Sequence, residues 1–271
     1  MTVRRLAGGL AGLVCGAALA QPPAVPTPAT PVTPATHTQP PDGWTADVAP
    51  STTKSGDGAL ALPKALADAR AALAATRDYT CTLVRQEKVN GVPQAEQTCS
   101  LGVRTKPTAV LLGVTAPKAA VASTSYFPAR SSITVRHQAG TQPLKTLPKD
   151  DPAARATCRH PVTGYGLAAV LDRVEAVVAD QQRGHRPTQV LVADYTFADK
   201  PVTRFEVFAD RPTADAPRRL VLCLDAATKL PVRYEAYGAP TPASPGGEVL
   251  EVVSFLSTRV NVGLGDAVFE R

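Results

Sequence analysis

The chain of 271 residues carries a formal net charge of +6. Its basic residues are spread along the sequence, whereas a nucleic-acid-binding protein normally concentrates them in a patch or stripe. The charge pattern therefore excludes a nucleic-acid partner and leaves open a weak attraction to anionic lipid surfaces.

The first 20 residues have the layout of a secretory signal peptide. A short basic start precedes the apolar run Leu6–Ala20, which ends in the small-x-small cleavage site Ala18-Leu19-Ala20. We expect the mature chain to begin at Gln21 and to be exported to the periplasm or cell envelope. Two of the 29 basic residues precede that site, so 27 basic and 23 acidic residues would remain, a net charge of +4.

Two alternatives to a cleaved signal peptide stay open. The apolar run could be retained as a membrane anchor, although its 15 residues fall short of the roughly 20 that span a bilayer. Cleavage could instead precede Cys15 and leave that thiol acylated, but the bulky Val14 stands where a small residue is expected.

Residues 21–58 form a tether rich in Pro, Thr and Ala, which holds 9 of the 26 prolines. Proline removes backbone donors and fixes φ, and the segment has little apolar area to offset the entropy cost of ordering. We expect a disordered, extended spacer in which Trp44 is exposed to solvent. The folded domain is then predicted to span residues 59–271.

Two segments have the spacing of amphipathic helices. Leu60–Arg77 has Pro63 near its first turn, where proline is tolerated, and Gly164–Arg183 is followed by Gly184 as a stop. Charged residues occupy the opposite faces, so each helix is predicted to pack one side on a core. The apolar positions are Leu62, Leu66, Ala69 and Leu73 in the first segment, and Leu167, Val170, Leu171, Val174, Val177 and Val178 in the second.

A β-hairpin is predicted around Asn90-Gly91, because the strand-like segments Tyr79–Lys88 and Val92–Thr105 flank this dipeptide. A three-residue loop that ends at Gly91 would pair residues whose numbers sum to 180.

The folded domain has four cysteines, Cys81, Cys99, Cys158 and Cys223. An even number in an exported chain predicts two disulfides, and four cysteines allow three pairings. In the hairpin register above, Cys81 faces Cys99 closely enough for a bridge, although a one-residue slip would undo it. The remaining pair would be Cys158 with Cys223.

Short, mostly alternating strand-like segments dominate the rest of the chain. They are Ala109–Thr115, Ser131–His137, Gln189–Phe197, Val202–Phe208, Arg218–Leu224, Val232–Tyr237 and Val249–Val260. Residues 138–161 are polar and interrupted by proline, which predicts a long loop or a lid. The order of helix, strands, helix and strands predicts an α+β fold, with an antiparallel sheet and helices on one face.

The sequence lacks the motifs of common catalytic and metal sites: HExxH, paired CxxC, GxSxG and GxxxxGK[ST]. The four histidines are scattered, and a disulfide or structural role explains Cys158-Arg159-His160 more simply than metal binding does. Surface turns explain Asp150-Asp151 and Asp194 better than an acid–base pair does. We therefore expect no enzyme activity, no metal and no cofactor.

Five segments carry a family resemblance. They are Asp78–Gly91, Val103–Pro107, Arg159–Leu167, Asp225–Tyr237 and Asn261–Phe269. Together they resemble an uncharacterised bacterial family, a domain of unknown function common in planctomycetes. The chain is also similar to the outer-membrane lipoprotein-sorting (LolA-like) superfamily, through its helix order and the D-x-x-T-x-L-P-V-R segment at Asp225–Arg233. The resemblance covers Leu60–Phe269.

The superfamily resemblance implies a curved antiparallel half-open β-barrel with two main helices packed on its concave side. The apolar cavity between them would hold acyl chains. Residues 123–157 depart from the family pattern, with more proline and fewer glycine turns. The basic residue that gates the cavity of the sorting carriers has no matching position, so no functional residue is carried over. From the apolar patterns alone, the candidate lining residues are Leu111, Leu171, Val174, Val207 and Leu222, each of which could equally be ordinary core.

These expectations lead to a main hypothesis and an alternative. A dry cavity would take up lipid tails, at about 0.8 kcal/mol per buried CH₂ group. The main hypothesis is a monomeric exported carrier that binds the acyl chains of a lipid or lipoprotein and performs no chemistry. The alternative is an envelope sensor or regulatory domain, similar to RseB, that binds a membrane-protein partner. A hydrolase would need a converging nucleophile and base, which the sequence does not offer.

Overall fold

The computed structural model describes most of the predicted folded domain. The described residues are 58–138, 144–149, 151–155, 158–186, 188–210 and 216–270. They belong to one unit, Val48–Arg271. The predicted signal peptide and all but the last residue of the predicted tether lie outside the described residues.

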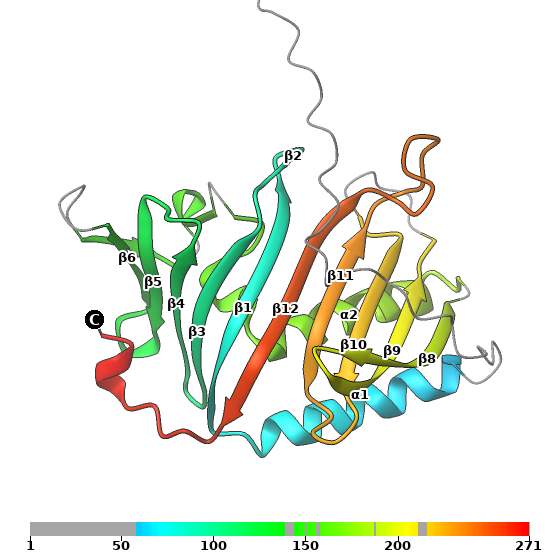
Figure 1. Ribbon diagram of the computed structural model, residues 1–271, viewed down its shortest axis with the longest axis horizontal. Coiled ribbons are helices and arrows are strands. Elements are labelled where there is room, and N and C mark those ends of the chain that lie inside the picture. The colour runs from blue at the N-terminus through cyan, green and yellow to red at the C-terminus, as the bar shows by residue number, and fades with distance from the viewer. Residues whose placement is uncertain are drawn as a thin grey trace, which may run out of the picture. The chain divides into compact units, whose positions relative to one another are not determined.

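One antiparallel sheet runs through the described part of the chain (Figure 1). Eleven of its strands follow the order β7-β6-β5-β4-β3-β1-β12-β11-β10-β9-β8, and the short β2 pairs with β1. Their bounds are β1 (Asp78–Val89), β2 (Val92–Pro93), β3 (Gln97–Thr105), β4 (Thr108–Ala116), β5 (Val121–Phe127), β6 (Ser132–His137), β7 (Lys145–Pro148), β8 (Gln189–Phe197), β9 (Lys200–Phe208), β10 (Arg219–Asp225), β11 (Pro231–Tyr237) and β12 (Val249–Val260). The first strand pairs with the last, so two meanders join in the middle of the sheet.

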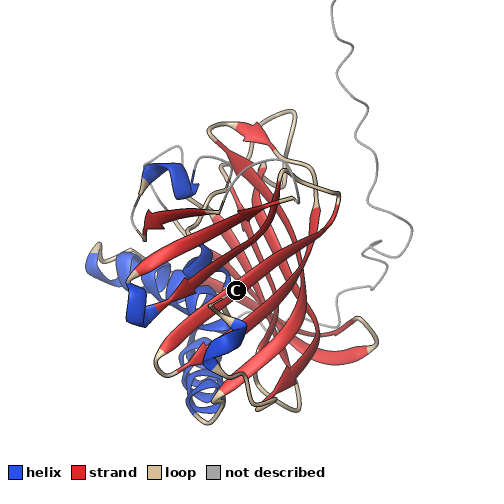
Figure 2. Cartoon of the chain, turned by 90° about the vertical axis from the view of Figure 1, so that its left-hand side faces the viewer, coloured by secondary structure: helices blue, strands red, loops and turns tan. Residues whose placement is uncertain are grey.

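Both α-helices of the described residues lie on one side of this sheet (Figure 2). α1 (Gly58–Ala74) precedes β1, and α2 (Leu167–Arg183) connects the β7 edge to the β8 edge. Four short 3-10 helices complete the description: η1 (Pro128–Arg130), η2 (Pro152–Arg155), η3 (Val162–Tyr165) and η4 (Asp266–Val268). The predicted α+β fold, a curved antiparallel half-open barrel with two helices on its concave side, is confirmed. Neither described α-helix is long and apolar enough to cross a membrane.

The apolar stripe of α2 forms the centre of the core. Leu167, Val170, Leu171 and Val174 have 0% of their surface exposed, and they belong to one cluster with apolar residues of α1 and of the sheet. The two helices are also joined by Arg70, whose Nε atom donates a hydrogen bond of 2.9 Å to Oε1 of Glu175. The predicted inward face of each helix is therefore the observed one.

Both helix boundaries differ from the prediction for local reasons. α1 ends at Ala74 rather than Arg77, because Thr76 donates its backbone N–H to Leu73 O and its hydroxyl to Ala72 O. α2 begins at Leu167 rather than Gly164, because Gly164 lies within η3. The buried Tyr79 hydroxyl accepts the hydrogen bond of the Leu167 N–H at 2.8 Å, which satisfies one donor of the first helical turn.

The Asn90-Gly91 hairpin forms, but with a shorter loop than predicted. Asn90 and Gly91 have φ of 50° and 82°, as a two-residue turn of type I′ requires, and Val89 pairs with Val92. The register then shifts between β2 and β3, so that Cys81 pairs with Leu101 and Leu83 with Cys99. The predicted register is wrong by two residues, and the predicted Cys81–Cys99 disulfide is absent because the two cysteines are diagonal neighbours.

The predicted Cys158–Cys223 disulfide is also wrong. Strand β10 alternates its side chains, so Leu222 faces the helices while Cys223 packs with Val221 in a cluster on the opposite face of the sheet. Cys158 packs against the helix-side core and donates an Sγ hydrogen bond of 3.3 Å to Ala154 O. The two thiols therefore lie on different sides of the sheet.

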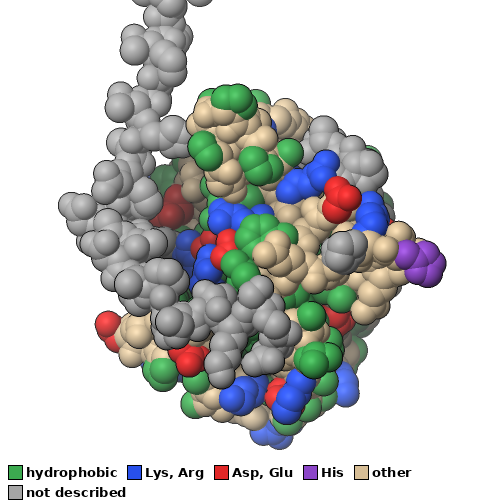
Figure 3. All heavy atoms as spheres, turned by 90° about the vertical axis from the view of Figure 1, so that its right-hand side faces the viewer, with side chains coloured by type: hydrophobic (Ala, Val, Ile, Leu, Met, Phe, Trp, Pro, Cys, Tyr) green, Lys and Arg blue, Asp and Glu red, His purple; other side chains and the backbone are tan. Residues whose placement is uncertain are grey.

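The opposite face of β9–β11 carries paired charges over the small cluster that contains Cys223. Arg204 and Arg219 each lie 2.8 Å from a carboxylate oxygen of Glu206, and the Arg219 guanidinium stacks 3.9 Å from the centre of the Tyr237 ring. Seen from the β8 side, basic and acidic side chains lie close together between apolar ones (Figure 3). Both guanidinium groups over this cluster therefore face the same carboxylate.

The thiol state of the cysteines can be tested by alkylation without a reductant. In the folded protein, iodoacetamide should leave Cys81 and Cys223 unmodified, because burial raises the pKa of each thiol to about 12 and the thiolate is the nucleophile. After unfolding in guanidinium chloride, mass spectrometry of the peptides should find both cysteines alkylated. A cross-linked peptide that contains Cys81 and Cys99, or Cys158 and Cys223, would contradict the structure.

The packing of α2 predicts a large loss of stability for Leu171→Ala. This side chain is fully buried, and such truncations lower the free energy of unfolding by about 2–5 kcal/mol. Urea denaturation followed by circular dichroism measures the change. Arg183→Ala on the same helix is the control, because its side chain is 72% exposed and a change within about 0.5 kcal/mol is expected. Equal stabilities of the two variants would be inconsistent with the core described above.

Candidate functional site: a pocket with a charged polar end

A pocket of about 360 Å³ lies beside α2, on the face of the sheet that carries the helices. Three groups of residues line it. They are β4–β6 with the loop before β5, the segment of η2 and η3, and the end of β1 with the start of β3 and the loop before it. The lining residues are Arg85, Glu87, Gln94, Ala95, Gln97, Leu112, Val114, Ala119, Ala120, Val121, Thr124, Val135, Ala153, Ala154, Cys158, Val162 and Tyr165.

One side of the pocket is apolar because the strands of this wing alternate. Leu112 and Val114 of β4 face the pocket, together with Val121 of β5 and Val135 of β6. Leu112 is buried, whereas the three valines are only half-buried. The wall therefore keeps apolar surface that a ligand could cover.

The other end of the pocket is polar, because Arg85 and Glu87 lie on the same face of β1 as the core residue Leu83. Arg85 donates from Nε and Nη2 to Oε1 of Gln97, at 3.1 and 2.8 Å. Its guanidinium also stacks over the Tyr165 ring, 4.4 Å from the centre. Arg85 and Glu87 are only 8% and 5% exposed, so this end consists of buried charge.

Tyr165 holds the carboxylate of Glu87. Its hydroxyl lies 2.9 Å from both Oε1 and Oε2 of Glu87, and the backbone N–H of Arg159 donates to Oε2 at 3.4 Å. Burial raises the pKa of the Tyr165 hydroxyl well above its usual value, so the group stays a donor. Nη1 of Arg85 lies 3.6 Å from Oε2 of the same carboxylate.

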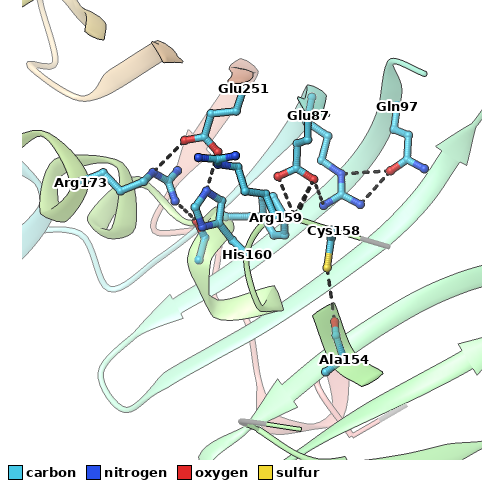
Figure 4. Close-up of polar contacts among 11 residues, drawn as sticks. Glu87, Gln97, Ala154, Cys158, Arg159, His160, Arg173 and Glu251 are labelled. Atoms are coloured by element: carbon cyan, nitrogen blue, oxygen red, sulfur yellow. Dashed lines mark hydrogen bonds and ion pairs between the residues drawn. The ribbon is translucent and has the colours of Figure 1, made fainter. Parts of the chain in front are cut away.

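A second buried carboxylate, Glu251 of β12, pairs directly with Glu87 across the β1–β12 ladder. His160 Nε2 lies 2.5 Å and Arg173 Nε 3.3 Å from the Glu251 oxygens (Figure 4). Burial would raise the pKa of Glu251, but the hydrogen bond to His160 and the charge of Arg173 outweigh it, and the pKa is lowered. Arg173 in turn donates to Gly164 O at 2.8 Å, so the network ties η3 and α2 to the sheet.

Glu87, His160 and Glu251 bring three ligand atoms within 4.8 Å of one another, which raises the question of a metal. Both carboxylates already face guanidinium groups, those of Arg85 and Arg173, and a divalent cation would lie in their positive field. The arrangement suits an internal charge network better than a metal centre. His160 thus has a structural contact with Glu251.

The five candidate lining residues lie elsewhere. Leu171, Val174, Val207 and Leu222 are fully buried in the main core, and none of them lines the 360 Å³ pocket. Leu111 points to the opposite face of the sheet, where it lines a shallow pocket of about 370 Å³. Leu171 and Val174 of α2 therefore pack with Val207 and Leu222 of the sheet in one core, while the pocket described above lies to one side.

The residues at the polar end of the pocket were not predicted from the sequence. The alternation of β1 carried a usable signal, because Tyr79, Cys81 and Leu83 share their parity with Arg85 and Glu87. A charged pair on the apolar face of a strand indicates buried, paired charge. Nothing local in the sequence placed Glu251 opposite Glu87, since 164 residues separate them.

The fold class of this protein is an open antiparallel sheet with two α-helices on its concave side. Its candidate site is a pocket with one apolar and one charged end. The sequence pattern of the family described as "Protein of unknown function (DUF1571)" matches residues 76–271. The chain belongs to this family, which confirms the predicted membership of an uncharacterised family. A search of curated proteins finds no match.

Solved structures similar to this chain include those of three proteins. The lipoprotein LppX of Mycobacterium tuberculosis has a TM-score of 0.43 and 12% identity, over 75% of this chain and 98% of LppX. MucB, solved in complex with MucA(peri), has a TM-score of 0.42 and 14% identity, over 77% of this chain and 59% of MucB. The LolA superfamily protein NE2245 of Nitrosomonas europaea has a TM-score of 0.33 and 12% identity, over 77% and 97%.

The charge network predicts a large, pH-dependent effect of Glu251→Gln. Removing one partner of a buried ion pair lowers the free energy of unfolding by about 3–5 kcal/mol, here at pH 7. The folded pKa of Glu251 lies below its ordinary value of 4.5. The ionised carboxylate therefore contributes stability above pH 4.5, and this contribution is lost as the pH falls through the folded pKa. The gap between the two proteins should narrow in acid, as urea denaturation at several pH values would measure.

The control for this prediction is Glu248→Gln. Glu248 pairs with Lys88, and its side chain is 51% exposed, so the change should cost less than about 1 kcal/mol. A Glu251→Gln variant as stable as wild type at pH 7 would rule out the proposed role of the network.

Proposed function

We propose that this chain is an exported carrier domain that holds the acyl chain of a lipid or lipoprotein in the 360 Å³ pocket and performs no catalysis. The observation that supports the proposal is the half-buried apolar wall of Val114, Val121 and Val135. An acyl chain on this wall would remove the remaining apolar surface from water, at about 0.8 kcal/mol for each CH₂ group buried.

The size of the pocket suits one chain. A water molecule occupies about 30 Å³ in the liquid, and a CH₂ group is of similar size. A volume of about 360 Å³ therefore has room for on the order of a dozen such groups. The pocket is lined by exposed residues at its rim, such as Ala120 and Ala153, so the chain could enter from solvent.

The polar groups of the pocket favour binding over chemistry. Glu87 accepts hydrogen bonds from Tyr165 and Arg159, and burial keeps the Tyr165 hydroxyl protonated. A general base needs an accessible carboxylate or imidazole within hydrogen-bond reach of its substrate. Groups that satisfy one another in this way orient a ligand rather than react with it.

Val114→Trp tests the carrier function by filling the pocket. We expect native mass spectrometry of the exported wild-type protein to detect a bound lipid, and the variant to carry at least tenfold less. The indole would occupy the space of several CH₂ groups, and losing two of them already accounts for more than a factor of ten.

The matched control is Thr115→Trp on the next position of β4. Thr115 is exposed and does not line the pocket, so its replacement should leave the bound lipid unchanged. Wild-type protein that is free of lipid, and that instead co-purifies with a membrane protein, would reject the carrier in favour of a sensor domain.

A further inference from the structure

One guanidinium nitrogen at the polar end of the pocket has no hydrogen-bond partner among the described residues. Arg85 uses Nε and Nη2 to bind Gln97, but its Nη1 is buried and makes no hydrogen bond. The nearest carboxylate oxygen, Oε2 of Glu87, lies 3.6 Å away, beyond hydrogen-bond distance. Arg85 lines the pocket, so its unused donor belongs to the pocket wall.

The unpaired Nη1 of Arg85 destabilises the folded protein unless an acceptor of a ligand binds it. A buried charged donor without an acceptor is destabilising, so an acceptor supplied by a ligand would stabilise this end of the pocket. Arg85 cannot easily turn away, because Gln97 holds two of its nitrogens and the Tyr165 ring lies under its plane. The donor is therefore held in place before any ligand arrives.

The buried polar atom without a hydrogen-bond partner at this end of the pocket is a donor, Nη1 of Arg85. The two oxygens of Glu87 already accept hydrogen bonds from Tyr165 and Arg159. Gln97 turns its Oε1 to Arg85, and its Nε2 carries two further N–H donors on a side chain that also lines the pocket. A ligand group that binds these donors must therefore bring an acceptor atom, such as an oxygen.

We infer that Arg85 Nη1 binds an acyl oxygen of the ligand, either of a free carboxylate or of an ester carbonyl, while the chain extends over Val114, Val121 and Val135. This inference rests on the proposed carrier function and adds the head-group chemistry and the residue that recognises it. A cationic head group is disfavoured, because it would meet the charge of Arg85.

Calorimetric titration with three probes of equal chain length tests the inference on the mature full-length protein. Dodecanoate carries a carboxylate, 1-monododecanoylglycerol an ester carbonyl, and dodecyltrimethylammonium no acceptor. The first two should bind wild type more tightly than the third. Arg85→Met should weaken the binding of the first two by about tenfold or more and leave the third unchanged or tighter.

The outcomes separate the sources of the acyl oxygen. Weaker binding of dodecanoate alone supports a carboxylate, and weaker binding of the ester alone supports an ester carbonyl. Affinities for both probes that are unchanged by Arg85→Met overturn the assignment of Arg85 while leaving the carrier function in place. Failure of the wild-type protein to bind any of the probes overturns the carrier function and the assignment with it.

Two further variants guard against an effect on folding. Arg219→Met is the matched control, since Arg219 pairs with Glu206 on the other face of the sheet, and it should bind all three probes like wild type. Arg85→Lys keeps the charge but loses the planar fork of donors. If Arg85→Met does not fold, Arg85→Lys should still bind dodecanoate about threefold to tenfold more weakly than wild type, and wild-type affinity in this variant overturns the assignment.

Discussion

The pairing of the first strand with the last places two buried carboxylates side by side, and the site depends on how their repulsion is offset. Glu87 and Glu251 are cross-strand partners with 5% and 1% of their surface exposed. Like charges in this position destabilise a sheet, and buried charge requires partners. Arg85, on the sheet itself, is a partner of Glu87. Residues 159–173 supply the other partners of the two carboxylates, and this segment is thereby held against β1 and β12.

The need to pair the buried charge of Glu87 also shapes one end of the pocket. Tyr165 donates to Glu87, lies under the guanidinium of Arg85 and lines the pocket. Its ring also meets that of His160 edge-on, at 6.1 Å between the centres. One end of the pocket is therefore fixed by hydrogen bonds and stacked rings, whereas the other is a wall of half-buried valines. A fixed polar end and a wall without directional contacts suit a ligand with one defined head group and a chain of variable length.

The sequence predicted the layers of the fold better than the contacts within them. Helical spacing identified the buried faces of both helices, and the order of elements indicated the antiparallel sheet. The predicted Cys81–Cys99 disulfide failed because register is a property of the turn: the loop is one residue shorter, and the shift between β2 and β3 moves Cys99 opposite Leu83. Glu251 and Glu87 meet only through the β1–β12 pairing, which no local pattern encodes. The alternation of β1, by contrast, did indicate that Arg85 faces inward.

The position of the pocket beside α2, rather than beneath it, follows from the cost of empty volume. An unfilled apolar cavity costs about 24 cal/mol per Å³, so a void of the pocket's 360 Å³ under α2 would cost on the order of 9 kcal/mol. That is comparable to the whole stability of a typical domain. Leu171 and Val174 accordingly have 0% of their surface exposed. At the β4–β6 wing the valines of the wall are half-buried, so water can occupy the hollow and no dry apolar void results.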